Sequence, residues 1–264
     1  SLPACTKEAY NLNNQNAHLN TKSSTNNHDN IHEWNKYKRL TQAEEIVAYI
    51  IGKLHEIDAP GTLLYGTMLH EYRNGTDGPC LYPNLDDKDF DIAVFPKHLL
   101  YINSMANEIR TKFGWKLGYD RRMEQRLIST IWPTDNFGPK YQIDIYGFQC
   151  NKTSELIHFP WDAVTIARNA FLPVHKHKLI VSQNEGETVA TTNDDNSPGF
   201  YMPYDPPCLL ANIYGLDFMT PKKGAASQAK WGTENGRPAH DNPGCNYTLT
   251  DSEKEELERQ LELC

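Results

Sequence analysis

Two aspartates separated by one residue stand in a short apolar segment of the sequence, Asp89-Phe90-Asp91-Ile92-Ala93-Val94-Phe95. Because successive side chains of a β-strand point to opposite faces, Asp89 and Asp91 are expected to share one face of a strand. Two carboxylates this close repel each other unless a cation lies between them, and hard oxygen ligands favour Mg²⁺ or Mn²⁺. The spacing therefore predicts a divalent metal site, with a solvated strand edge as the alternative.

A later segment supplies a third carboxylate. Tyr141-Gln142-Ile143-Asp144-Ile145-Tyr146 is rich in β-branched and aromatic residues, which predicts a strand, and Asp144 is its one acidic residue. We expect Asp144 to complete the metal site, so that Asp89, Asp91 and Asp144 are the predicted metal ligands and catalytic residues.

A Gly-Thr step precedes these strands and indicates a phosphate-binding helix start. Gly66 and Thr67 lie between an apolar run and a predicted helix, where backbone N–H groups suit an anion. Gly66 either permits a turn with positive φ or lets a phosphate approach the backbone. Arg73 follows on that helix and either contacts phosphate or forms a surface ion pair. The other cations predicted to contact substrate are Lys88, Arg126 and Lys140.

These segments together resemble the LicD/fukutin family of the nucleotidyltransferase superfamily. The resemblance rests first on the Gly66–Leu69 motif with Arg73 and on the Lys-Asp-Phe-Asp string of residues 88–91, which is closest to the fukutin branch. It is carried further by Asp144 and its strand and by the Tyr-Gly end of the helix at 209–215, and it covers residues 40–225.

The string before the metal strand departs from the pattern of bacterial members. Those members carry an additional carboxylate where this chain has Lys88, although Asp86 and Asp87 stand directly before it. The departure leaves the number of metal ions open.

The resemblance implies a fold and an activity. The fold is α+β, a nucleotidyltransferase-like mixed β-sheet flanked by helices, with a loop-rich C-terminal extension. The activity is metal-dependent transfer of a phospho-alcohol, of the ribitol phosphate or phosphocholine type, from a CDP-alcohol donor to a glycan or glycoprotein acceptor. Two alternatives are a nucleotidyltransferase that modifies a protein or small molecule, and an inactive glycan-binding member, which the presence of Lys88 keeps open.

Composition excludes some classes of partner. The chain has 264 residues, a formal net charge of −8 and a sequence pI near 5.7. Nucleic-acid binding relies on a basic surface, so no nucleic-acid partner is expected. No apolar run is long enough to span a bilayer, so we expect membrane attachment only through an anchor outside this chain.

Cysteines and glycosylation sequons indicate the compartment. The six cysteines contain no Cys-x-x-Cys pair, which favours disulfides over a thiolate metal site. Three Asn-x-Thr sequons begin at Asn74, Asn151 and Asn246. Together they predict the lumen of the secretory pathway, such as the Golgi, or secretion.

The remaining pattern predicts the elements that position the site. Residues 1–33 are polar and predict a poorly ordered arm, and residues 34–264 a single catalytic domain. Helices are expected at 41–57, from a capping box at Thr41, at 97–112, and at 250–263, from a second capping box at Thr250. Strands are expected at 115–118, 127–132 and 141–148. Residues 149–207 predict loops with short strands near 171–172 and 178–181, and His175 and His177 offer a zinc site or surface histidines.

Overall fold

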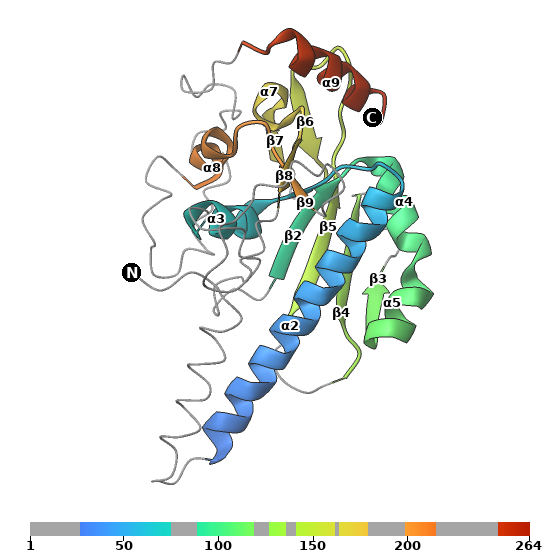
Figure 1. Cartoon of the computed structure of the whole chain (residues 1–264), viewed down its shortest axis with the longest axis vertical. Helices are drawn as coiled ribbons and strands as arrows, with labels where there is room; N and C mark the ends of the chain where they lie inside the picture. The colour runs from blue at the N-terminus through green and yellow to red at the C-terminus, as the bar shows by residue number, and fades with distance from the viewer. Residues whose placement is uncertain are drawn as a thin grey trace, which may run out of the picture.

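The computed structural model describes residues 27–74, 89–118, 127–135, 141–161, 164–178, 199–214 and 248–264. Its main feature is a seven-stranded mixed sheet in the order β3-β4-β5-β2-β1-β9-β8, flanked by helices (Figure 1). The strands are β1 Gly61–Leu63, β2 Asp89–Val94, β3 Trp115–Gly118, β4 Ile128–Pro133, β5 Gln142–Gly147, β8 His175–Lys178 and β9 Gly199–Met202. The predicted mixed sheet with flanking helices is confirmed.

The centre of the sheet is the part that carries the acidic residues. β2 pairs in parallel with β5 and antiparallel with β1. Every residue of β2 after Asp89 is buried, which is typical of a strand covered on both faces. The expected strands at 115–118, 127–132 and 141–148 are confirmed as β3, β4 and β5.

The first helix begins earlier than the sequence predicts. α2 spans Asn27–Glu56 and crosses the sheet in Figure 1, with Ile46, Val47 and Ile50 fully buried. The capping box at Thr41 is therefore wrong as a helix start, because the residues before it are already helical and leave no free N–H groups for it to cap. Residues 27–33 of the predicted arm are helical, and residues 1–26 lie outside the described residues.

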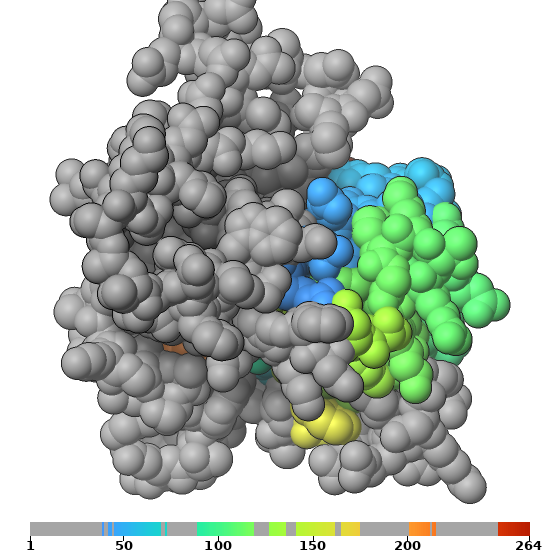
Figure 2. Space-filling view, turned by 90° about the horizontal axis from the view of Figure 1, so that it is seen from below, coloured from blue at the N-terminus to red at the C-terminus, as the bar shows by residue number. Residues whose placement is uncertain are grey.

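The expected helix at 97–112 is two helices. α4 spans Pro96–Ser104 and α5 spans Ala106–Phe113, with Met105 between them at φ −84° and ψ 5°. Gly114 ends α5 at φ 71°, a left-handed conformation that favours glycine. α5 packs on α2 through Tyr49 and Phe113, whose ring centroids lie 5.4 Å apart. Seen from below, blue side chains of α2 adjoin the green segment that includes α5 (Figure 2).

The region from 149 to 207 contains more regular structure than the predicted loops with short strands. It holds the hairpin β6 Leu156–Phe159 and β7 Val164–Ala167, the short helix α7 Arg168–Phe171, β8 and β9, and the helix α8 Pro206–Tyr214 begins at its end. The expected strand near 171–172 is the end of α7, and of residues 178–181 only Lys178 is described, as the last residue of β8. Four-residue strands are too short to show a clear alternation in sequence.

An aromatic cluster attaches this hairpin to the main sheet. Phe148, directly after β5, lies 5.8 Å from Phe159 of β6 and 5.1 Å from Phe171 of α7, measured between ring centroids. Phe95, at the end of β2, lies 4.8 Å from Phe148. All four rings are fully or almost fully buried, so burial of aromatic surface joins the two sheets.

The chain ends in the helix α9, Asp251–Leu261, which matches the predicted position. Thr250 caps it as predicted, because its hydroxyl accepts from the Glu253 N–H while the Glu253 carboxylate accepts from the Thr250 N–H. Near the C-terminal end of α9, the Gln260 side chain accepts from the N–H of Val174, at 2.8 Å, and donates to its carbonyl, at 3.0 Å. Cys264 is joined by a disulfide to Cys150, with 5.5 Å between the Cα atoms.

Two further expectations concern the helix with the Tyr-Gly motif and membrane-spanning segments. The helix that carries the Tyr-Gly motif is present as α8. Among the helices of the described ranges, none is both long and apolar enough to cross a membrane.

Candidate metal centre

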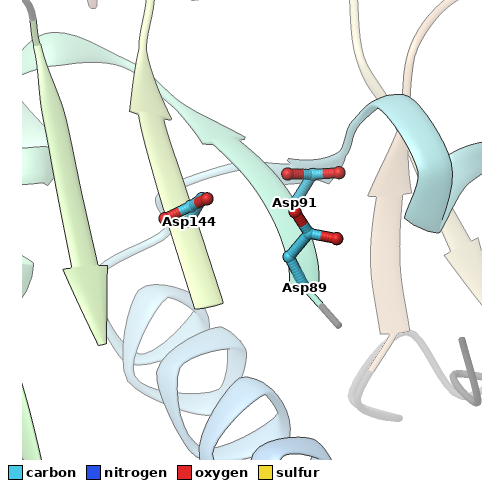
Figure 3. Close-up of side chains that lie close together, drawn as sticks. All are labelled: Asp89, Asp91 and Asp144. Atoms are coloured by element: carbon cyan, nitrogen blue, oxygen red, sulfur yellow. The ribbon is translucent and has the colours of Figure 1, made fainter. Parts of the chain in front are cut away.

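Pairing of β2 with β5 brings the three predicted carboxylates together. The parallel register places Asp91 opposite Asp144 and Asp89 opposite Gln142. Asp89 lies two residues before Asp91 on the same face of β2. Oxygen atoms of Asp89, Asp91 and Asp144 lie within 4.8 Å of one another (Figure 3). We call these three residues the carboxylate cluster.

Burial makes it unfavourable for all three carboxylates of the cluster to be charged at the same time. Asp91 and Asp144 are each 7% exposed, and Asp89 is half-buried. Burial raises the pKa of the Asp89 carboxyl, because removal from water disfavours the charged form. Convergent carboxylates in a partly dry site are stabilised by a bound cation, and an all-oxygen ligand set suits Mg²⁺, Mn²⁺ or Ca²⁺. The cluster can therefore hold a divalent ion.

Two neighbouring side chains orient Asp144, and the sequence analysis missed both. The Thr130 hydroxyl, opposite Asp144 on β4, donates to Asp144 Oδ1 at 2.7 Å. The Gln142 amide donates to Asp144 Oδ2 at 2.9 Å. Gln142 was detectable, because it stands two residues before Asp144 and so shares its face of β5. Thr130 was not, because its position depends on the antiparallel register of β4 with β5.

The Gly-Thr step is tied directly to the metal strand. The Thr67 hydroxyl is buried and accepts a hydrogen bond from the Asp91 N–H at 2.7 Å. The Leu64 N–H donates to the Asp91 carbonyl at 3.0 Å. Both backbone groups of Asp91 are thus held by the segment that opens the helix α3, Tyr65–Asn74. Thr67 has a positioning role here, and its predicted contact with substrate stays a prediction.

The tight turn before α3 is made by a tyrosine and not by the glycine. Tyr65 has φ 46°, in the left-handed region that residues with a Cβ rarely adopt, whereas Gly66 is not among the described residues with positive φ. A positive φ is thus not the reason for Gly66, which lies half-buried in the first turn of α3. The ring of Tyr65 packs at 5.2 Å on that of Tyr146, which follows Asp144 by two residues. Strain of this kind is found preferentially at functional sites.

The side chains of the predicted cations lie outside the described part of the chain. Arg73 belongs to α3, which starts beside the metal strand, but the description of α3 does not extend to its side chain. Lys88, Arg126 and Lys140 lie outside the described residues, as do Asp86 and Asp87. His175 and His177 lie on β8, again without described side chains. Substrate contacts by these residues remain predictions.

No protein-family model and no curated protein sequence matches the chain. The resemblance to the LicD/fukutin family therefore rests on the motifs in the sequence. The carboxylate geometry is independent of that resemblance and defines a candidate divalent-metal centre on a mixed sheet.

Proposed function

We propose that this chain is a metal-dependent transferase that moves a phospho-alcohol from a CDP-alcohol donor to a glycan or glycoprotein acceptor. The observation that carries the proposal is the convergence of Asp89, Asp91 and Asp144 from two neighbouring strands. The LicD/fukutin resemblance of the motifs around these residues supports the donor and acceptor classes. Mg²⁺ or Mn²⁺ is the proposed cofactor, because the ligand set consists of carboxylate oxygens.

Each part of the site has a distinct task in this reaction. The carboxylate cluster would hold the ion, which when bound neutralises charge on the diphosphate of the donor. Thr130 and Gln142 fix both oxygens of Asp144, and Thr67 fixes the backbone of Asp91, so the cluster is organised before any ligand arrives. Gly66, at the start of α3, is proposed to let the phosphates approach, and Arg73, Lys88, Arg126 and Lys140 to supply positive charge.

The compartment proposed for this reaction is the secretory lumen, such as the Golgi, or the exterior of the cell. Cys150 and Cys264 form a disulfide, and Cys208 is also disulfide-bonded. Disulfides are rare in reducing compartments. A lumenal site would also place the protein with glycan acceptors.

A donor assay tests the proposal. The protein is incubated with CDP-ribitol, CDP-choline or ATP, in Mn²⁺ or in EDTA, and released CMP and pyrophosphate are measured. CMP released from a CDP-alcohol only with Mn²⁺ is the expected result. Pyrophosphate released from ATP would support the nucleotidyltransferase alternative, and no turnover with any donor would support the inactive glycan-binding alternative.

Matched variants connect any turnover to the site. Asp144→Asn keeps the size of the side chain and removes its charge. It should lower turnover by about 100-fold or more, since losing even an outer-shell partner of a metal ligand typically costs about 10–100-fold. Glu45→Gln removes an exposed carboxylate of α2 and should retain the activity of the original protein.

A further inference from the structure

The turn between β5 and β6 carries one of the three sequons. Asn151, Lys152 and Thr153 are all exposed, and Asn151 directly follows the disulfide-bonded Cys150. Exposure is the first requirement for a modified side chain, since an attached glycan is bulky and must project into solvent. Of the three sequons, this is the one whose asparagine and threonine side chains are both described.

The hydrogen bonds of the turn leave the amide nitrogen of Asn151 available. Asn151 Oδ1 accepts from both the N–H and the hydroxyl of Thr153, each at 3.0 Å. Within the described part of the chain, Asn151 Nδ2 donates no hydrogen bond. A substituent on Nδ2 would therefore keep every contact that Asn151 makes in the folded turn.

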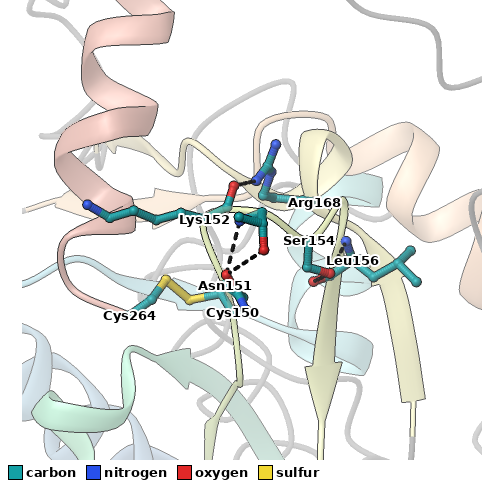
Figure 4. The surroundings of a disulfide bond; sticks show 8 residues. Cys150, Asn151, Lys152, Ser154, Leu156, Arg168 and Cys264 are labelled. Atoms are coloured by element: carbon teal, nitrogen blue, oxygen red, sulfur yellow. Dashed lines mark hydrogen bonds between the residues drawn. A yellow bond between two sulfur atoms is a disulfide. The ribbon is translucent and has the colours of Figure 1, made fainter.

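The same contacts make the folded turn a poor substrate for a glycosylating enzyme. The Thr153 hydroxyl, which defines the sequon, is bonded to Asn151 itself. Arg168 donates to the Lys152 carbonyl at 2.8 Å, and the disulfide with Cys264 holds Cys150 (Figure 4). The Lys152 ammonium also pairs with Glu262. An enzyme that must extend the sequon in its own active site would have to break several of these contacts.

We propose that Asn151 is N-glycosylated and that this happens before the Cys150–Cys264 disulfide closes the turn. In the reaction, Asn151 Nδ2 attacks C1 of a lipid diphosphate-linked oligosaccharide. The Nδ2–C1 bond forms, the C1–O bond breaks, the lipid diphosphate leaves with the bonding electrons, and the transferase takes the proton lost from Nδ2. The order of events follows from the sequence, because Cys264 lies 114 residues after Cys150 and is synthesised long after the sequon.

The proposal depends on a secretory route for the chain and not on the transferase activity, so either can fail without the other. The test uses the chain secreted from a eukaryotic cell behind a cleavable signal sequence. Peptide mass spectrometry after amidase treatment, which converts a glycosylated Asn into Asp, then scores Asn151 separately from Asn74 and Asn246. A non-reducing peptide map of the same sample reports whether Cys150 and Cys264 are joined.

Most copies are expected to carry glycan on Asn151. Occupancy should fall to background in Asn151→Gln and Thr153→Ala, and should be retained in Lys152→Ala and in the conservative Thr153→Ser. Thr153→Ser is the conservative control for Thr153→Ala, because serine preserves both the hydroxyl and the sequon. Unmodified Asn151 in protein whose Cys150–Cys264 disulfide has formed would overturn the proposal.

Pulse labelling followed by trapping of free thiols tests the order. Chains that are glycosylated at Asn151 but still reduced at Cys150 should appear first, and Cys264→Ser should leave the occupancy of Asn151 unchanged. A severalfold rise of occupancy in Cys264→Ser would show that the disulfide forms early enough to compete with glycosylation, which contradicts the proposed order.

Discussion

The carboxylate cluster and the C-terminal helix α9 arrange charge in opposite ways. In the cluster, three acidic side chains converge on one small volume at the centre of the sheet. Around α9, opposite charges are paired, as in the pairs of Arg259 with Asp58 at 3.4 Å and of Lys254 with Asp251 at 2.8 Å. Like charges brought together oppose folding, whereas the pairs at α9 favour it slightly. The difference is the one expected if α9 serves stability and the cluster holds a metal ion, as proposed.

The two regions also differ in what holds them in place. The cluster is positioned by backbone pairing of β2 with β5, by the hydrogen bond that the Asp91 N–H donates to Thr67, and by those that Thr130 and Gln142 donate to Asp144. The end of α9 is held by a covalent bond and by the two buried hydrogen bonds of Gln260 to Val174. Exposed ion pairs contribute at most about 1 kcal/mol each, so the disulfide and Gln260 dominate the attachment of α9.

The largest stability effect is expected from the disulfide. The double variant Cys150→Ser with Cys264→Ser should lose about 2–4 kcal/mol of unfolding free energy, because the disulfide restricts a long loop of the unfolded chain. Urea denaturation measures the loss, and the original protein under reducing conditions should lose at least as much, because reduction also breaks the disulfide of Cys208. A loss below about 0.5 kcal/mol would show that α9 is held without the disulfide, since typical disulfides contribute several times more.

His98 of α4 is a buried titratable side chain, and the pH dependence of stability tests the effect of its burial. Its side chain is buried, no partner of its Nδ1 is found in the described residues, and burial, with a smaller effect of Lys97, lowers its pKa to about 4. The pKa of His98 is lower in the folded state than in the unfolded state. The unfolding free energy that depends on keeping His98 neutral is therefore fully present above pH 6.5 and is lost as the pH falls toward 4.

The original protein should therefore lose up to about 2 kcal/mol more than His98→Leu between pH 7 and pH 5. Urea denaturation of both proteins at both pH values measures the difference. Equal pH dependence in His98→Leu and the original protein would mean that the pKa of His98 is not lowered in the folded state.

The two capping-box sequences, at Thr41 and Thr250, allow a direct comparison with a smaller expected effect on stability. Thr250→Ala should cost about 1 kcal/mol, because it removes the cap of α9. Thr41→Ala, inside α2, should change stability by less than about 0.5 kcal/mol, since alanine is the better helix former and no cap is lost. Thermal unfolding of both variants measures the contrast, and equal losses would contradict the early start of α2.

The smallest expected effect is the removal of one charge from the carboxylate cluster without metal. The pKa of Asp89 is raised in the folded state by burial, so its contribution to stability is favourable at low pH and is lost as the pH rises through the raised value. In EDTA at pH 7, Asp89→Asn should be more stable than the original protein, whereas Glu45→Gln should not. A less stable Asp89→Asn would show that the ionised carboxylate is already compensated by the protein.

Local sequence patterns predicted the three aspartates of the site better than the residues that hold those aspartates in place. The alternation in residues 89–94 and 142–146 was sufficient to place Asp89, Asp91 and Asp144 on strands, and the structure pairs those strands. Thr130 could not be found in this way, because its contact with Asp144 depends on a register between strands. Thr41 and Thr250 have the same local pattern, and only the residues preceding each decide whether a helix starts there.

Binding of Mn²⁺ to the carboxylate cluster tests the central claim most directly. Titration of the EDTA-treated and desalted protein, followed by the loss of the electron paramagnetic resonance signal of free Mn²⁺, should show saturable binding in the original protein and in Glu45→Gln. Asp91→Asn and Asp144→Asn should lose that binding while remaining folded by circular dichroism. Saturable binding that is unchanged in both variants, or no binding by the original protein, would contradict a metal centre at Asp89, Asp91 and Asp144.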